Sequence, residues 1–207
     1  MIVYVESNFV LEIALEQEQS SAARSILSLA ESHQIGLAYP SFVLSEPFEN
    51  IMRANRERND LQTALLKVFN YMQRSEPYRG IMLDFEPLVR MLRGAYGRQV
   101  DLLHSAFDQL ISIGRCISID ISSFREAPAY RRSLRLSPQD SIIYSAIVAD
   151  LKSQPQDEVK CFLSRDRKAF GSDDDRSVKA ELGKYNCRYI GNFTQGLDFI
   201  RSSLKLG

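Results

Sequence analysis

The chain has 207 residues, of which 44% are hydrophobic and 25% charged, and these are ordinary values for a globular protein that buries a core. Its 26 basic and 26 acidic side chains cancel, which argues against a polybasic nucleic-acid binder of the histone type. The charges are nevertheless segregated along the chain. Residues 1–52 carry one basic and seven acidic side chains (net −6), residues 53–100 carry nine basic and five acidic (net +4), and residues 121–136 carry four basic and one acidic (net +3).

The sequence shows no pattern typical of a targeting segment or of metal-binding cysteines. No apolar run approaches the roughly 20 residues that span a bilayer, and the first ten residues lack the basic region of a signal peptide, so we expect a cytoplasmic protein without a membrane partner. Cys116, Cys161 and Cys187 are far apart and form no CxxC pair, which favours reduced core thiols. His33 and His104 have no partner at ligand spacing, which disfavours a histidine metal site.

The amino-terminal part of the chain alternates short strands and helices. Apolar runs predict buried strands at residues 2–5 and 35–39. Helical spacing of apolar residues predicts helices at residues 9–15, 20–30 and 42–55.

The middle of the chain is helical from residue 60 to about 113, and an extended segment is expected at 116–121. The rest is expected to form a helix at 137–151, strands at 159–163 and 187–190, and a last helix at 193–204. Strands that alternate with helices indicate an α/β fold with a mainly parallel sheet. We expect one domain over residues 1–207, with a helical insertion, or arm, at about residues 56–115.

Four acidic residues are expected at one edge of this sheet. Glu6 follows the first strand, Glu46 lies in the helix after the second, Asp140 begins an Ile- and Ala-rich helix, and Asp166 follows the strand at 159–163. Ligands of open parallel sheets bind outside the carboxyl ends of the strands, so these side chains should meet. Four ionised acids in one cleft need a cation, and oxygen ligands suit Mg²⁺ or Mn²⁺. Divalent ions held by carboxylates are an arrangement for phosphodiester hydrolysis.

Read in order, these residues resemble the PIN domain family. The resemblance is carried by Val3-Tyr4-Val5-Glu6-Ser7-Asn8, by Glu46, by Asp140, and by Leu163-Ser164-Arg165-Asp166. It covers residues 1–52 and 137–200, whereas residues 53–136 contain no motif of the family.

The resemblance implies a three-layer α/β/α fold and a metal-dependent nuclease, most often an endoribonuclease that acts on single-stranded or structured RNA. It implies that Glu6, Glu46, Asp140 and Asp166 bind Mg²⁺ or Mn²⁺ and are catalytic. Asn8, Ser164 and Arg165 would then support the ligands or face the substrate. Some PIN domains are the toxin half of toxin–antitoxin pairs, so an antitoxin-like protein is one conceivable partner.

One departure from the family keeps an inactive protein open as an alternative. The family usually has Asp where Glu6 stands, and the extra methylene shifts the carboxylate although Mg²⁺ demands near-ideal geometry. The alternative is a catalytically inactive PIN-like module that binds RNA or a protein. A receiver-like or phosphatase-like domain ranks third, because the first strand offers Glu6 and no Asp as phosphoryl acceptor.

Plain structural roles are also open for the acids. Ser137-x-x-Asp140, with Pro138 between, fits a capping box, and Asp166 could pair with Arg165 or Arg167. The run at residues 173–175 is most simply a solvated loop.

The basic residues ahead of Asp140 offer a contact for RNA. Arg131 and Arg132, in a basic loop at residues 125–135, could bind phosphates, and Tyr130 could stack on a base. An exposed loop without a ligand is the other interpretation. The apolar stripes and arginines of the arm could likewise guide a phosphate backbone or form a homo-oligomer interface.

Overall fold

Five parallel strands form one sheet in the computed structural model, which describes residues 1–78, 86–171 and 176–205. The order is β3-β2-β1-β4-β5, and the strands are β1 (Ile2–Val5), β2 (Gly36–Pro40), β3 (Arg115–Ile117), β4 (Lys160–Leu163) and β5 (Cys187–Ile190). The central strands are buried on both faces, which explains their unbroken apolar runs. The expected parallel α/β sheet is therefore confirmed.

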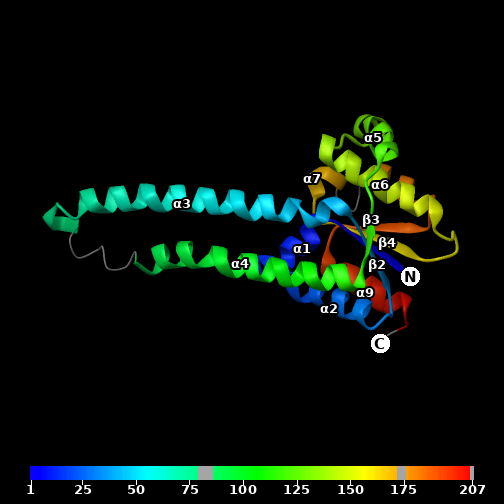
Figure 1. Ribbon diagram of the computed structural model, residues 1–207, viewed down its shortest axis with the longest axis horizontal. Helices are drawn as coiled ribbons and strands as arrows, with labels where there is room; N and C mark the ends of the chain where they lie inside the picture. Colours follow the sequence, from blue (N-terminus) through cyan, green and yellow to red (C-terminus); the bar gives the residue numbers. More distant parts are fainter. Residues whose placement is uncertain (79–85, 172–175, 206–207) are drawn as a thin grey trace.

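Helices cover both faces of this sheet (Figure 1). Three helices pack on one face, together with the sheet-proximal parts of α3 and α4: α1 (Ser7–Ala14), α2 (Ser20–Glu31) and α9 (Phe193–Ser203). The other face carries α5 (Ile121–Leu134), α6 (Pro138–Ser153), α7 (Arg167–Phe170) and α8 (Arg176–Gly183). Alternate residues of β1 serve the two cores: Val3 and Val5 pack on the first face and Tyr4 on the second.

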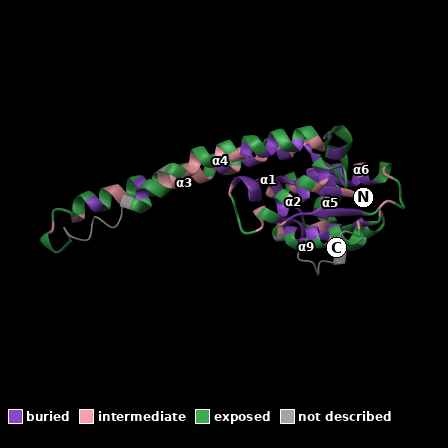
Figure 2. Cartoon of the chain, turned by 90° about the horizontal axis from the view of Figure 1, so that it is seen from below, coloured by how far each residue is buried: buried purple, intermediate pink, exposed green. Residues whose placement is uncertain are grey.

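Two long helices extend away from the sheet, side by side (Figure 1). Helix α3 (Glu46–Met72) has 27 residues and α4 (Glu86–Ile113) has 28, so each is about 40 Å long. Short 3-10 turns occur at Ser41–Leu44 and Glu76–Tyr78. Much of the length of α3 and α4 beyond the sheet is exposed to solvent (Figure 2). The helix expected at residues 42–55 and the first one beyond residue 60 are in fact one continuous helix.

The segment interpreted above as a basic loop is a helix. Asp120 caps α5 by accepting a hydrogen bond from the backbone N–H of Ser123, and Ala127 on the inner face is buried against α6. Pro128 inside the helix and the weak apolar pattern hide it in the sequence. The extended segment is also shorter than expected, since β3 ends at Ile117.

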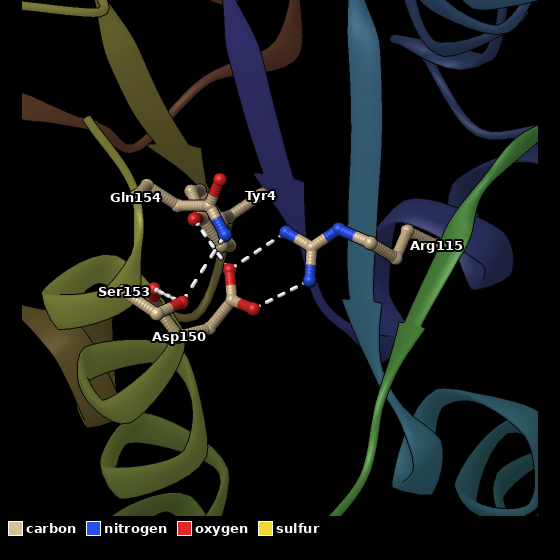
Figure 3. A network of polar contacts seen from close by, with 5 residues as sticks. All are labelled: Tyr4, Arg115, Asp150, Ser153 and Gln154. Carbon is tan, nitrogen blue, oxygen red and sulfur yellow. Dashed lines mark hydrogen bonds and ion pairs between the residues drawn. The ribbon is translucent and has the colours of Figure 1, made fainter.

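Asp150, near the end of α6, fastens three elements together (Figure 3). Its carboxylate accepts a hydrogen bond from the buried Tyr4 hydroxyl at 2.6 Å. The Arg115 guanidinium reaches across β2 and binds both carboxylate oxygens, at 2.5 and 2.7 Å. Bidentate pairs of this kind are geometrically specific, so they fix the positions of β1, the edge strand β3 and α6 relative to one another.

Two further expectations concern thiols and membranes. Cys161 and Cys187 are buried free thiols, as expected, but Cys116 is exposed and is not part of the core. Within the described ranges, no helix combines the length and the apolar character that crossing a membrane requires.

Candidate functional site

The four predicted acids all lie at the amino ends of helices. Glu6 follows β1 and caps α1, because its Oε2 accepts a hydrogen bond from the Asn8 backbone N–H at 2.9 Å. Asp166 follows β4 and caps α7, where its Oδ1 accepts from the N–H groups of Lys168 (2.9 Å) and Ala169 (2.8 Å). The positive ends of these two helix dipoles therefore face carboxylates.

The other two acids begin longer helices. Glu46 is the first residue of α3, two residues past the 3-10 turn that follows β2. Asp140 lies in the first turn of α6, and its N–H donates to the hydroxyl of the cap residue Ser137 at 3.1 Å. This is the first half of the expected capping box, in which the cap hydroxyl accepts from the backbone N–H. The Ser137 hydroxyl also donates to the Asp140 carboxylate at 2.5 Å, a contact between the two side chains.

The sheet topology explains why these helices start at one place. The chain passes from β1 outward to β2 and β3, and then returns to add β4 and β5 on the other side of β1. The carboxyl ends of β1 and β4 are therefore a topological switch point, where open α/β sheets form their ligand crevice. Glu6 follows β1 directly, and Asp166 lies three residues past the end of β4.

Glu6 is in an unfavourable position for an ionised carboxylate. Its side chain is 5% exposed, and Oε1 has no hydrogen-bond partner of normal geometry among the residues described. The pKa of Glu6 is raised to about 8, chiefly by burial and also by the negative charges of Glu46 and Asp166, although the Asn8 N–H and the Ser164 side chain oppose the shift. A buried acid with an orphan oxygen and like charges beside it attracts a proton or a cation.

The remaining acids belong to the same electrostatic group. Burial raises the pKa of Glu46, and the charges of Asp140 and Asp166 add to this. Burial also raises the pKa of Asp140, with a further contribution from Asp166. The structure therefore brings the four acids near enough for the charge of Asp166 to disfavour the ionised forms of Glu6, Glu46 and Asp140.

Proximity does not amount to a finished metal cage. In the parts of the chain that the structure describes, no group of three or more His, Cys, Asp or Glu side chains is arranged to hold a metal ion. Neighbouring hydroxyls bind two of the carboxylates instead: Ser7 donates to Glu46 Oε2, and Ser137 donates to Asp140. A cation would have to draw the carboxylates away from these serines.

The predicted substrate residues next to Asp166 have distinct surroundings. Asn8 and Arg165 line an open polar cleft of about 640 Å³ together with Asp166. Ser164 is fully buried, and its hydroxyl accepts a hydrogen bond from the Asp166 N–H at 3.0 Å, so it positions that acid. Arg165 does not pair with Asp166.

The guanidinium of Arg165 is already engaged by two carboxylates. One nitrogen donates to Glu12, whose side chain is 1% exposed, and the other donates to Glu18 at 2.6 Å. Because a buried carboxylate needs a partner, Arg165 has a structural task that the sequence did not reveal. The alternative partner Arg167 has a side chain that lies outside the described residues, as do residues 173–175.

Arg131 and Arg132 lie elsewhere, exposed in the last turn of α5. They are not among the residues that line the cleft beside Asp166. Tyr130 packs edge-on against Tyr144, with ring centroids 5.2 Å apart, and burial raises its pKa to about 12. Part of its half-buried ring is therefore a core contact, and stacking of Tyr130 on a base stays a prediction.

Two residues of the site were not singled out from the sequence. Ser7 binds Glu46, and Arg53 supplies positive charge that lowers the pKa of Glu46. Arg53 follows Glu46 by seven residues, which is two helical turns, so the same-face spacing was a usable signal for it. The Ser7 contact joins α1 to α3 and has no local signature.

Comparisons of the chain with protein-family models, with curated proteins and with solved structures gave no match.

Proposed function

We propose that this protein is a PIN-like, divalent-metal-dependent nuclease that hydrolyses phosphodiester bonds in RNA. One observation supports it above all: four carboxylates lie at four helix amino ends near the switch point of a parallel sheet, and burial together with the charges of neighbouring acids raises the pKa of Glu6, Glu46 and Asp140. The repulsion between neighbouring carboxylates destabilises the fold, and a bound cation would offset that repulsion.

The chemistry of the donors fits Mg²⁺ or Mn²⁺. All four groups are carboxylates, which hard divalent ions prefer. Among the described residues, the buried Glu6 Oε1 has no hydrogen-bond partner of normal geometry. Glu6, Glu46, Asp140 and Asp166 would hold the ion. When bound, such an ion lowers the pKa of a water molecule and stabilises the leaving oxyanion.

The protein's own residues have separate tasks in this proposal. Ser7 and Ser164 orient Glu46 and Asp166, which fixes where the negative charge is presented. The polar cleft lined by Asn8 and Arg165 admits the nucleic acid beside Asp166. Arg131 and Arg132 would meet phosphates farther along the strand.

The α3–α4 pair corresponds to the inserted helical arm of the proposed PIN-like domain. Its outer surface exposes apolar side chains, including Leu61 (51% exposed), Val68 (52%) and Met91 (62%), beside exposed arginines. A homo-oligomer contact or an antitoxin-like partner would cover such side chains, and the arginines would guide RNA. These partner assignments are part of the proposal.

The decisive experiment is metal-dependent cleavage of a fluorescently labelled single-stranded RNA. We expect cleavage with Mn²⁺ or Mg²⁺, none with EDTA, and a loss of about 100-fold or more in Asp140→Asn, which keeps the hydrogen bonds of the capping box. The matched control is Asp157→Asn, an exposed loop acid. Cleavage that survives Asp140→Asn would contradict the proposal and indicate a contaminant.

A second function is a catalytically inactive PIN-like module that binds RNA or a protein. Two observations favour it: each of the four acids already has a capping or hydroxyl partner, and the first acid is Glu6, which is longer than the usual Asp. Binding of RNA without cleavage under any divalent ion, and without a change in melting temperature on adding Mn²⁺, would favour this second function.

A further inference from the structure

Helices α2, α7 and α9 each bring a polar side chain, at or near their amino ends, to the open cleft beside Asp166. The cleft has a volume of about 640 Å³, and the residues that line it include Gln19, Lys168 and Asn192. Gln19 is the cap residue of α2, Lys168 lies in α7, and Asn192 is the cap residue of α9. Segments that are far apart in the sequence thus meet at this cleft.

Two of these side chains are amides whose oxygen atoms are already bound. Gln19 Oε1 accepts a hydrogen bond from the Phe193 backbone N–H at 2.7 Å, and Asn192 Oδ1 accepts from the Gln195 N–H at 3.0 Å. Within the described residues, neither amide nitrogen has a hydrogen-bond partner. The NH₂ groups are therefore the parts of Gln19 and Asn192 that are available to a ligand, and an NH₂ group can only donate.

Lys168 adds a positive charge to these donors. Its side chain is exposed, and in the part of the chain that the structure describes its ammonium group has no ion pair or hydrogen bond. Arg165 differs, because Glu12 and Glu18 already bind its guanidinium. Of the two described cations that line the cleft, Lys168 is thus the one available to a ligand.

A ligand that matches these donors carries negative charge and only accepts hydrogen bonds. Phosphate oxygens have both properties, whereas most nucleobase edges carry donors as well as acceptors. The charge of Asp166 in the same cleft repels a phosphate, and a cation bound to the acids would offset this repulsion. The donors therefore favour a phosphate group as the ligand, placed directly beside the acids.

We propose that Gln19, Lys168 and Asn192 form a phosphate-binding subsite that holds a phosphate group of the RNA beside the acids. The assignment of this phosphate to an RNA substrate rests on the proposed nuclease function, whereas phosphate binding itself can be measured without cleavage. Contacts to phosphates position a strand and do not read its bases, so the subsite tolerates any sequence. An internal phosphodiester and a terminal monophosphate offer the same acceptor oxygens.

The test titrates three probes into metal-free, ¹⁵N-labelled protein at low salt: uridine 5′-monophosphate (UMP), the dinucleotide UpU, and uridine. We expect UMP to shift the side-chain NH₂ resonances of Gln19 and Asn192, and uridine to bind about fivefold more weakly or less. Binding of both UMP and UpU supports a subsite for an internal phosphodiester. Binding of UMP alone supports a subsite for a terminal phosphate.

Isosteric variants separate ligand binding from folding. Gln19→Glu and Asn192→Asp keep the oxygen that accepts a backbone N–H but replace the NH₂ donor by a charged oxygen. Each should weaken UMP binding about tenfold or more, and Lys168→Ala about fivefold. The controls are Gln109→Glu and Lys179→Ala, which make the same kinds of change at exposed positions outside the cleft. Circular dichroism checks the fold of each variant.

The proposal is overturned if UMP leaves the Gln19 and Asn192 resonances unshifted, if uridine binds as tightly as UMP, or if the control variants weaken binding as much as the cleft variants. A preference of about tenfold for GMP over UMP would also overturn it, because the cleft would then read a base.

An RNA cleavage assay separates this inference from the nuclease proposal. Phosphate binding that depends on Lys168, without any cleavage of RNA, would contradict the nuclease and support the subsite. Metal-dependent cleavage with an unchanged KM in Lys168→Ala would support the nuclease and overturn the subsite.

Discussion

The two ends of helix α6 carry carboxylates in opposite circumstances. Asp140 at its start lies among three other acids, and burial and the charge of Asp166 raise its pKa. Asp150, ten residues later, receives the Tyr4 hydroxyl and both arms of the Arg115 guanidinium (Figure 3). The start of α6 thus lies among other carboxylates, whereas the carboxylate near its end is paired with a guanidinium.

The difference separates a stabilising network from a costly one. The Asp150 network satisfies its acceptors with one cation and one hydroxyl, and it ties together elements far apart in the sequence. The acids near Asp140 repel one another, and Arg53 is the cation found to ease Glu46. Acids with raised pKa values cluster at functional sites, which is why we propose that the function lies at the start of α6.

A large loss of stability, independent of pH between 5 and 8, is expected when Asp150 is removed. Asp150→Ala should lower the free energy of unfolding by about 2–3 kcal/mol, because the buried Tyr4 hydroxyl loses its acceptor and Arg115 its partner. Urea denaturation measures this, and Asp157→Ala is the control at an exposed acid. A change below about 0.5 kcal/mol would mean that the network does not hold the sheet together.

Glu6, unlike Asp150, is expected to destabilise the folded protein when it is ionised. Its pKa rises from 4.5 when unfolded to about 8 when folded, so the native state binds the extra proton and stability falls as pH rises from 4.5 toward 8. Glu6→Gln should remove a slope of up to about 1.4 kcal/mol per pH unit in metal-free protein. Glu46 and Asp140 shift in the same direction, so some slope remains.

Melting temperatures between pH 5 and 8 in EDTA would show this flattening, with the exposed Glu31→Gln as control. If Glu6→Gln were as pH-dependent as the wild type, the crowding of the acids would be refuted.

The smallest effect is expected at Arg53. Its positive charge lowers the pKa of Glu46, and the side chain is exposed, so Arg53→Ala should raise that pKa only slightly. Carbon-detected NMR of the Glu46 carboxyl group measures the shift at low salt. Arg56→Ala, also exposed on α3, should leave it unchanged; an equal shift in both variants would show a general charge effect.

The sequence was most informative where local pattern and burial agree. The strands were predictable because a parallel sheet buried on both faces requires continuous apolar runs such as Ile2–Val5. Helix α5 was missed because Pro128 and its arginines resemble a loop, and its contacts with α6 compensate for the poor local propensity. The continuity of α3 through residues 55–60 was missed because a polar surface helix shows little apolar periodicity there.

Within the candidate site, the four acids were predictable from their places after strands and at helix starts. Their partners were not. Ser7 beside Glu46 and Glu12 beside Arg165 join residues 39 and 153 positions apart, and no spacing rule reaches that far. The same limit applies to Tyr130, because the sequence does not show that its ring packs against the ring of Tyr144.

The sequence by itself determined the class of fold and the acids that the fold presents at one edge, because strand burial and helix capping are local properties of the chain. It also determined that negative charge gathers near the amino terminus and positive charge in the following segment. Only the tertiary structure decided which charges are relieved, with Asp150 matched by Arg115 and Glu6 left with an orphan oxygen. Burial and electrostatic environment arise from residues that are distant along the chain, so local patterns could not reveal them.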